Sequence, residues 1–339
     1  MKQEDIKSML ELPVPFEDLK NSRVLITGAN GLIGSYLCKT LDALNALFQW
    51  NINIAALVRS PEKGEALREQ LTEKNLFHVM IGDVTEPVKT EMSFDYIIHT
   101  ACPTAGAFFT QHPVETISTI VEGTKNLLFL AKAQDVRSFV YVSSMEVYGE
   151  VTEEKLLSED CLGGLALSNL RNCYPEGKRM AEQLCLAMMS EYQVPAKVIR
   201  LAQTFGPGVS KTENRVYAQF LRSSVKGEDI VLHTEGKSKR MYLDTMDAIS
   251  AILTVLVAGQ DGAVYNAANR TTYCSIREMA EQTVAFFNSK SKVIVDAEKN
   301  IGQYPPDNML KLDTSRLEAL GWEARFSLEQ MYKRMAEEI

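Results

Sequence analysis

Short apolar runs alternate with longer segments of helical periodicity through most of the first 270 residues of this 339-residue chain. The runs are continuously apolar and four to six residues long in most cases, whereas the intervening segments are amphipathic or polar. Continuous apolar strands that alternate with helices are typical of a parallel sheet covered on both faces. We therefore predict strands at 24–26, 54–58, 77–81, 96–99, 139–142, 196–200 and 264–267, and helices at about 32–44, 62–75, 114–134 and 175–192.

Composition limits the possible functions without choosing one. The formal net charge is −8 with both signs interleaved, which disfavours nucleic acid as a partner, because nucleic acid requires a basic face. No apolar run approaches the ~20 residues of a membrane span, and the start of the chain lacks the apolar core of a signal peptide. The six cysteines form no CxxC pair and the four histidines show no metal-ligand spacing. We expect a cytoplasmic enzyme with reduced cysteines, without a metal and without a membrane partner.

A glycine-rich turn joins the first predicted strand to the first predicted helix. Its sequence is Gly28-Ala29-Asn30-Gly31-Leu32-Ile33-Gly34, a GxxGxxG pattern. Glycine permits the positive φ of such a turn and a close approach of the backbone to a pyrophosphate, which the helix N-terminus then binds. The pattern predicts a Rossmann fold with NAD or NADP as cofactor, held by Gly28, Asn30, Gly31, Leu32, Ile33 and Gly34.

The predicted fold class is α/β, a doubly wound parallel sheet with a smaller C-terminal substrate-binding lobe. Residues 1–22 form an N-terminal extension. The alternation loosens after Gly206 and returns near Val264, so the lobe is expected to consist of separate segments. We assign 23–200 plus 241–270 to the NAD(P)-binding domain and 201–240 plus 271–339 to the substrate-binding lobe.

The choice between the two cofactors depends on the end of the second strand. An acid at that position binds the ribose hydroxyls of NAD, but this strand ends in Val58-Arg59-Ser60. Arg59 favours NADP, unless it is only a solvated charge. Asp83 follows the third strand and is placed to bind the adenine amino group. Val84, Thr100 and Ala101 are further expected cofactor contacts.

Tyr174 and Lys178 lie four residues apart and therefore on one helix face. A phenol with a pKa near ~10 is a poor base at neutral pH, but a neighbouring ammonium and a positive nicotinamide favour the phenolate. Pro175 is compatible with a helix, because proline is tolerated in the first turn. The pair alone occurs often by chance. Its position one strand and one helix after Ser143-Ser144 strengthens the assignment.

Together, the glycine turn, Asp83, the segment 143–149 and Tyr174/Lys178 resemble the extended short-chain dehydrogenase/reductase family, in its NAD-dependent epimerase/dehydratase branch. The similarity covers residues 23–335. It implies that Ser144 binds the sugar oxygen, that Tyr174 is the base and that Lys178 binds the nicotinamide ribose. It also implies a homodimer through the helices near 114–134 and 175–192.

Several stretches are most similar to UDP-glucuronate decarboxylases: 102–104, 112–124, 171–179 and 204–207. The resemblance implies transient oxidation at C4 of a nucleotide sugar, loss of CO₂ and reduction of the ketone. Glu146 matches a catalytic glutamate of decarboxylases and 4,6-dehydratases, although a structural acid is the alternative. Dehydratases place an aspartic acid just before it, whereas this chain has Met145, which disfavours dehydration. For the substrate we expect contacts with Thr104, Ser144, Gln203 and Arg240, with Arg240 on the diphosphate.

Four departures keep the reaction open. Gln203 and Ile120 stand where the family usually has Asn, and Met145 and Arg59 also break the decarboxylase pattern. A 4-epimerase, an NADPH-dependent keto-sugar reductase and a non-catalytic cofactor-binding protein remain as alternatives.

Overall fold

A seven-stranded, fully parallel sheet forms the centre of the structure, a computed structural model that describes residues 2–297 and 307–338. Each strand pairs in parallel with its neighbour in the order β3-β2-β1-β4-β5-β7-β11. The order reverses between β1 and β4, and in such sheets ligands bind beyond the carboxyl ends of the strands at this point. The strands are β1 (Arg23–Thr27), β2 (Asn53–Val58), β3 (Phe77–Ile81), β4 (Tyr96–His99), β5 (Ser138–Ser144), β7 (Ala196–Leu201) and β11 (Val264–Ala267).

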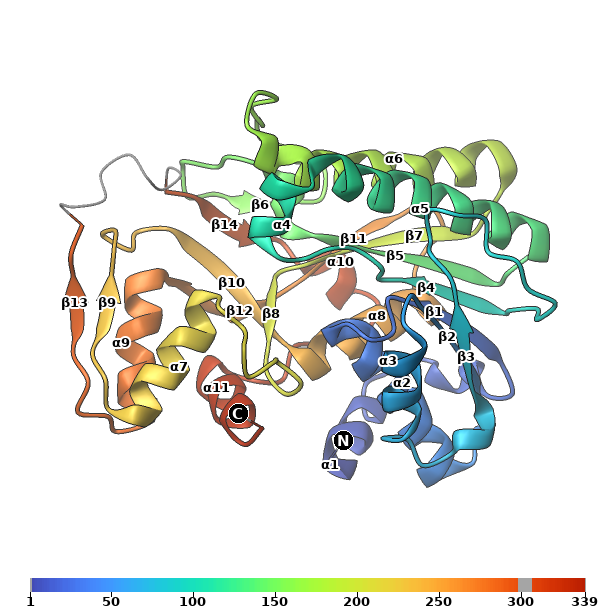
Figure 1. Cartoon of the computed structure of the whole chain (residues 1–339), viewed down its shortest axis with the longest axis horizontal. Coiled ribbons are helices and arrows are strands. Elements are labelled where there is room, and N and C mark those ends of the chain that lie inside the picture. Colours follow the sequence, from blue (N-terminus) through green and yellow to red (C-terminus); the bar gives the residue numbers. More distant parts are fainter. Residues whose placement is uncertain (1, 298–306, 339) are drawn as a thin grey trace.

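Helices cover both faces of this sheet, which confirms the predicted doubly wound α/β class. The helices α2 (Leu32–Phe48) and α8 (Thr245–Ala258) pack on one face, and α5 (Pro113–Gln134) and α6 (Cys173–Tyr192) lie side by side on the other (Figure 1). Each face has its own apolar core, because successive strand residues point to opposite sides. Val140 packs with the first core and Phe139 with the second.

The predicted helix 62–75 is wrong in length. Helix α3 (Pro61–Arg68) ends seven residues earlier, and a short 3₁₀ turn (Lys74–Leu76) precedes β3. The carboxylate of Asp42 in α2 accepts hydrogen bonds from the backbone N–H groups of Thr72 and Glu73, at 2.9 and 2.8 Å. These bonds offer the backbone an alternative to further helix, and the polar composition of α3 supplies little apolar surface to compete.

A second, mostly parallel sheet lies at the side of the first (Figure 1). The chain crosses between the sheets at Ala202 and Ala268, and the N–H of Ala202 donates to the carbonyl of Ala267. The sheet consists of β6 (Leu156–Leu157), β8 (Gln203–Phe205), β10 (Lys239–Asp244), β12 (Asn269–Ser275) and β14 (Met309–Leu312).

Further helices and a strand pair complete this side of the molecule. The proposed division into a cofactor domain and a lobe remains a prediction. The strand β6, from the range assigned to the cofactor domain, and all of β10, which crosses the proposed boundary at 240, pair within the second sheet. Residues 1, 298–306 and 339 lie outside the described residues. The remaining elements are α4 (Gly106–Gln111), α7 (Val216–Lys226), β9 (Ile230–Leu232), α9 (Ile276–Phe286), β13 (Val293–Val295), α10 (Ser315–Glu318) and α11 (Leu328–Ala336).

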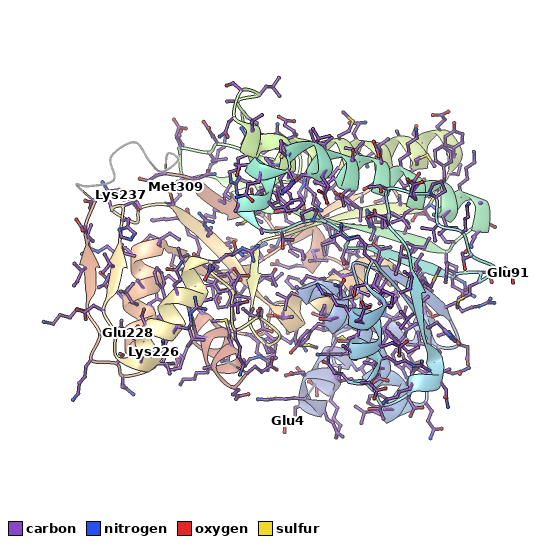
Figure 2. The ribbon with its side chains drawn as sticks, in the orientation of Figure 1. Glu4, Glu91, Lys226, Glu228, Lys237 and Met309 are labelled. Atoms are coloured by element: carbon purple, nitrogen blue, oxygen red, sulfur yellow. The ribbon has the colours of Figure 1, made fainter. Side chains whose placement is uncertain are left out.

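Charged side chains of both signs are spread over the surface. Lys226 and Glu228 lie close together at one end of the molecule, Glu91 lies at the opposite end and Glu4 lies along the lower edge of the view (Figure 2). Within residues 2–297 and 307–338, no helix is long and apolar enough to cross a membrane.

Buried ion pairs join the two ends of the chain. The guanidinium of Arg334 in α11 binds both carboxylate oxygens of Asp5, at 2.9 Å each, where Asp5 belongs to α1 (Gln3–Leu10). The Nε of Arg334 also lies 3.4 Å from Asp244 at the end of β10. Burial raises the pKa of the Asp244 carboxyl to about 7, although Arg334 acts in the opposite direction. This junction therefore contains an acid that titrates near neutrality.

We expect Asp244→Asn to change how stability depends on pH. The folded protein holds this proton to a higher pH than the unfolded chain, so its stabilising contribution is complete below the unfolded pKa and is lost as pH rises toward 7. The free energy of unfolding of the wild type minus that of the variant should fall between about pH 4 and 7, by a few kcal/mol at most at ~1.4 kcal/mol per pKa unit. Urea denaturation across this range measures the difference. The exposed acid variant Asp135→Asn is the control, and a difference independent of pH would contradict the prediction.

Candidate active site

The glycine turn has the geometry of a pyrophosphate cradle. Gly28 has a φ of +63°, and a Cβ at this residue would lie 2.7 Å from the Cα of Ala101. A Cβ on Gly34 would overlap the carbonyl of Gly28, so helix α2 approaches the turn more closely than a side chain permits. The N-cap of α2, Gly31, makes no side-chain hydrogen bond. The N–H groups of the first turn, which includes Leu32 and Ile33, are therefore available to an anion.

The ends of β1 and β4 form one hydrogen-bonded floor beside this turn. The hydroxyl of Thr100 donates to the carbonyl of Thr27 at 2.7 Å, and the N–H of Ala101 donates to the Thr27 hydroxyl at 3.3 Å. The imidazole of His99 lies 2.7 Å from the same hydroxyl and is fully buried. Burial lowers the pKa of His99 to about 3, so this ring is neutral. The structure thus brings the predicted residues Gly28, Thr100 and Ala101 together.

Arg59 lies between two acids at the end of β2. Its Nη1 is 3.9 Å from Asp83 and 3.8 Å from Glu115, and its side chain is 70% exposed. The other oxygen of Asp83 accepts from the N–H and hydroxyl of Thr85, which fixes the carboxylate. Val84 is buried against Gly123 of α5, where a Cβ would lie 2.7 Å from its side chain. Arg59 and Asp83 are therefore at the same edge of the site, as the sequence predicts.

Helix α6 carries Tyr174 and Lys178 on a buried face. Gly177 allows close packing on α5, because a Cβ there would lie 3.2 Å from Ile120. The ammonium of Lys178 donates to the carbonyl of Val142 at 2.8 Å and lies 5.8 Å from the centre of the Tyr174 ring. Both side chains are almost fully buried. The helix thus holds the pair against the carboxyl end of β5.

Burial dominates the proton affinity of the phenol. It raises the pKa of Tyr174 well above the usual value, while a hydrogen bond with Ser144 and the charge of Arg215 act to lower it. Burial also lowers the pKa of the Lys178 ammonium, with opposing contributions from Glu182 and two cysteines. The protein's own groups therefore do not produce the low phenol pKa expected from the sequence. A positive charge beside the ring is still required for phenolate at neutral pH.

The segment after β5 supplies the other predicted catalytic groups. The Ser144 hydroxyl accepts a hydrogen bond from the N–H of Glu146 at 3.3 Å and is also hydrogen-bonded to the Tyr174 phenol. Met145 is buried in the apolar core, consistent with its inability to donate a proton. The Glu146 carboxylate is ion-paired with the guanidinium of Arg171 at 2.9 Å. Glu146 is thus held by a cation that the sequence analysis did not assign to the site.

Phe109 is a second residue that the sequence analysis missed. Its ring stacks on Tyr174 with centroids 4.4 Å apart and an angle of 14° between the planes. The guanidinium of Arg171 lies 5.8 Å from the centre of the Phe109 ring. Phe109, in the short helix α4, therefore covers one face of the Tyr174 ring. An aromatic pair between residues so distant in sequence has no periodic pattern that would reveal it.

Arg215, the residue before α7, brings a further cation to this region. It donates to the backbone carbonyl of Thr104 at 2.7 Å and is paired with Glu213 at 3.0 Å. Its charge acts on the Tyr174 phenol, which places it at the same site. Thr104 itself is exposed. Arg215 lies in a polar loop of irregular pattern, so the sequence alone did not distinguish it from a solvated charge.

The remaining predicted substrate residues lie on neighbouring strands. Gln203 in β8 pairs in register with Tyr242 in β10, and Arg240 is two residues earlier on β10. The adjacent Lys239 is paired with Glu154 at 3.2 Å. The side chain of Arg240, by contrast, has no hydrogen bond or ion pair within the described ranges, and its Nε is buried. This half-buried guanidinium therefore has donors available for an anion.

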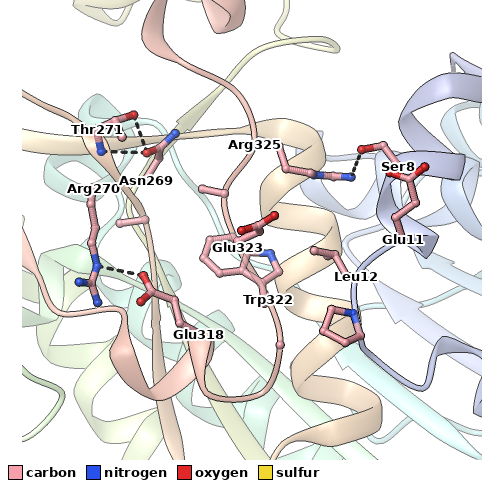
Figure 3. Close-up of a pocket in the computed structure, with 14 residues that line it drawn as sticks. Ser8, Glu11, Leu12, Asn269, Arg270, Thr271, Glu318, Trp322, Glu323 and Arg325 are labelled. Carbon is pink, nitrogen blue, oxygen red and sulfur yellow. Dashed lines mark hydrogen bonds and ion pairs between the residues drawn. The ribbon is translucent and has the colours of Figure 1, made fainter.

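An open pocket lies elsewhere, between the N-terminal segment and the chain around Trp322 (Figure 3). Its lining includes Ser8, Arg270 and Arg325 but none of the predicted site residues. In the part of the chain that the structure describes, no group of three or more His, Cys, Asp or Glu side chains is arranged to hold a metal ion.

The fold is that of a dinucleotide-binding α/β protein, and Ser144, Tyr174 and Lys178 lie together at the carboxyl end of β5. The model of the NAD dependent epimerase/dehydratase family matches residues 24–268, and the chain belongs to this family. It is similar to UDP-glucuronic acid decarboxylase 6 of Arabidopsis thaliana, with 29% identity over 97% of this chain and 93% of the relative. UDP-glucuronic acid decarboxylase 3 of the same plant is 30% identical over 96% of this chain and 93% of the relative.

Solved structures share the fold. A UDP-glucose 4-epimerase from Thermotoga maritima, with UDP-glucose, superposes with a TM-score of 0.76 at 20% identity, covering 93% of this chain and 97% of that one. A dTDP-glucose 4,6-dehydratase from Bacillus anthracis in complex with NAD gives a TM-score of 0.76 at 20% identity, with 93% and 96% covered. At this identity the likeness concerns the fold alone.

Proposed function

We propose that this protein modifies a nucleotide sugar by transient oxidation at C4, and that the reaction is decarboxylation of a UDP-glucuronate-like substrate. The principal support is the site itself, where Ser144, Tyr174, Lys178 and Glu146 meet at the end of β5, with Met145 in place of a proton donor. Similarity over nearly the full length to two UDP-glucuronic acid decarboxylases supports the same reaction. A bound nicotinamide would supply the hydride acceptor and donor.

Each protein group has a distinct task in this proposal. Ser144 donates its hydroxyl proton to the sugar oxygen, and Tyr174 removes the proton of the C4 hydroxyl as C4 is oxidised. Lys178 binds the nicotinamide ribose and keeps a positive charge near the phenol. The resulting 4-ketone accepts the electron pair released when the C5 carboxylate leaves as CO₂, and the enolate so formed takes a proton from water at C5. Tyr174 then returns its proton to the C4 oxygen when the ketone is reduced. The hydride taken from C4 is returned to C4, so the reaction consumes no cofactor.

Cations from the second lobe suit an anionic substrate. We assign the diphosphate to Arg240, whose donors have no partner among the described residues. Arg215 faces the Tyr174 end of the site and is the candidate to bind the sugar carboxylate. Guanidinium groups bind both kinds of anion through paired N–H donors.

Product analysis tests the proposal. Purified protein is incubated with UDP-glucuronate and, in parallel, with a panel of nucleotide sugars, each with NAD and with NADP. Mass spectrometry should detect loss of CO₂ from UDP-glucuronate, with no net change in the near-ultraviolet absorbance of reduced nicotinamide. An epimer without loss of mass would indicate the 4-epimerase, net oxidation of NADPH would indicate the reductase, and no change with any sugar would indicate a binding protein.

We propose that the cofactor is preferentially NADP, because Arg59 replaces the usual acid at the end of β2. Arg59→Leu should weaken NADP binding by about ten- to a hundredfold, since a hydrogen bond to a charged group contributes ~1.5–3 kcal/mol, while NAD binding changes little. Fluorescence titration measures both affinities, with Arg68→Leu in α3 as the control. Tighter binding of NAD than NADP by the wild type would overturn the preference and indicate that Asp83 and Glu115 repel the phosphate.

We also propose a homodimer through α5 and α6. The outer faces of these two adjacent helices carry exposed apolar side chains, which a partner would remove from water. Light scattering of the purified protein measures the oligomeric state. The exposed residues are Val114, Ile117, Phe129, Met180 and Tyr192.

A further inference from the structure

A buried ion pair lies directly beneath the candidate catalytic groups. Glu182 is in α6, one helical turn beyond Lys178, and its carboxylate accepts from the guanidinium of Arg200 in β7 at 2.7 Å. Side-chain exposure is 7% for Glu182 and 5% for Arg200. An ion pair so deeply buried carries a large desolvation cost, so its presence is not explained by stability alone.

The pair is joined to the catalytic strand. The hydroxyl of Ser143 donates to Glu182 at 2.5 Å, and Ser143 immediately precedes Ser144. One turn earlier on α6, Lys178 donates to the carbonyl of Val142. Helix α6 and the end of β5 are thus connected twice, by successive turns of the helix that carries Tyr174.

On its other side the pair contacts the 3₁₀ turn Met145–Tyr148 and the segment that follows β6. Arg200 donates to the hydroxyl of Tyr148 at 3.0 Å and to the carbonyl of Glu159 at 2.7 Å. Tyr148 donates in turn to Asn266 of β11 at 2.7 Å. Because Tyr148 ends the 3₁₀ turn that contains Glu146, the same network also fixes the position of this turn.

We propose that Glu182 and Arg200 are positioning residues, which hold the end of β5 against α6 so that Ser144, Tyr174 and Lys178 keep their mutual geometry. Glu182 has a second effect, because its negative charge opposes the burial that lowers the pKa of Lys178. The catalytic part of this inference rests on the proposed function. The positioning of Lys178 toward the cofactor does not.

Ser143→Ala is the least disruptive test, since it removes one hydrogen bond and leaves the ion pair. We expect kcat to fall by about ten- to a hundredfold with little change in KM, because misplacement by ~1 Å costs on that order. Ser138→Ala, at the opposite end of β5, is the matched control. The Ser138 hydroxyl accepts from Lys197 of a separate ion pair, and we expect no kinetic change.

Glu182→Gln tests the charge. The alkaline limb of the kcat profile should move to lower pH, because Lys178 loses its proton more easily without the carboxylate. Glu182→Asp should restore part of this shift. The control is Asp261→Asn, which neutralises the acid paired with Lys197. Lys197 lies on β7, as Arg200 does, and this variant should leave the pH profile of kcat unchanged.

NADH binding distinguishes this inference from the proposed function. NADH affinity is measured by fluorescence titration from about pH 7 to 10. As the pH rises, the affinity should begin to fall at a lower pH in Glu182→Gln than in wild type, because a charged donor binds hydroxyls more strongly than a neutral one. If the wild type turns over no nucleotide sugar, the proposed function fails and these titrations alone decide the inference. The inference would be overturned if Glu182→Gln bound NADH with the same pH dependence as the wild type and folded Ser143→Ala kept the kcat of the wild type.

Discussion

Tyr174→Phe should reduce kcat by at least about 10²–10⁴-fold, the contribution expected of a positioned acid–base group. The substitution removes only the hydroxyl, so the ring still stacks on Phe109 and the fold is retained. Cofactor affinity should be nearly unchanged, because Lys178 keeps its contact with Val142. Single-turnover kinetics and fluorescence titration of NADH measure the two quantities.

The matched control for this variant is Tyr192→Phe. Tyr192 lies at the other end of α6, on the proposed dimer face and away from Tyr174, so removal of its hydroxyl should leave kcat unchanged. Turnover near the wild-type rate in Tyr174→Phe would remove Tyr174 from its role as base. A parallel loss of NADH affinity would instead indicate that the phenol is part of the cofactor site.

Arg240→Leu should raise KM for the nucleotide sugar by about ten- to a hundredfold, because a hydrogen bond to a charged group contributes ~1.5–3 kcal/mol. The chemical step should change little, since a diphosphate contact is made equally in the ground and transition states. Steady-state kinetics at varied substrate concentration separates KM from kcat. The result would establish which cation of β10 binds the substrate.

Lys239→Leu provides the comparison at the neighbouring position. Lys239 is paired with Glu154 and lies 5.8 Å from the Tyr273 ring, so its charge is already engaged. We expect KM within about twofold of wild type, as for an exposed ion pair of small energy. Equal increases in KM for both variants would mean that a general positive potential, rather than Arg240, binds the substrate.

The cofactor end of the site was predictable from sequence because its features are local. The turn from Gly28 to Gly34 follows one strand and precedes one helix, and the structure shows the close approaches that require glycine at both ends. Tyr174 and Lys178 share a helix face by spacing alone. The parallel sheet followed from the continuous apolar runs.

The substrate end was less predictable because it depends on contacts between distant segments. Arg215 meets Thr104, and Arg171 meets Glu146, only after segments far apart in the sequence have packed together. Neither arginine stands in a periodic pattern, so the sequence analysis assigned neither of them to the site. The early end of α3 has the same origin, since Asp42 binds a backbone segment thirty residues later.

The pKa of Tyr174 shows where simple proximity reasoning fails. The ammonium of Lys178 lies close to the ring, yet burial of the phenol outweighs the favourable charges and raises its pKa. Charge proximity is visible in a sequence pattern, whereas burial depends on Phe109 and the packing of α4. Tyr174 can therefore act as a base at neutral pH only with the positively charged nicotinamide beside its ring.

A crystal structure with NAD or NADP and a nucleotide sugar tests the central claim most directly. The account predicts the Tyr174 hydroxyl within hydrogen-bond reach of the C4 oxygen, roughly 2.6–3.2 Å, with the sugar beside the reactive face of the nicotinamide. A Tyr174 hydroxyl that points into the packed interior, with the sugar bound away from the nicotinamide, would contradict it.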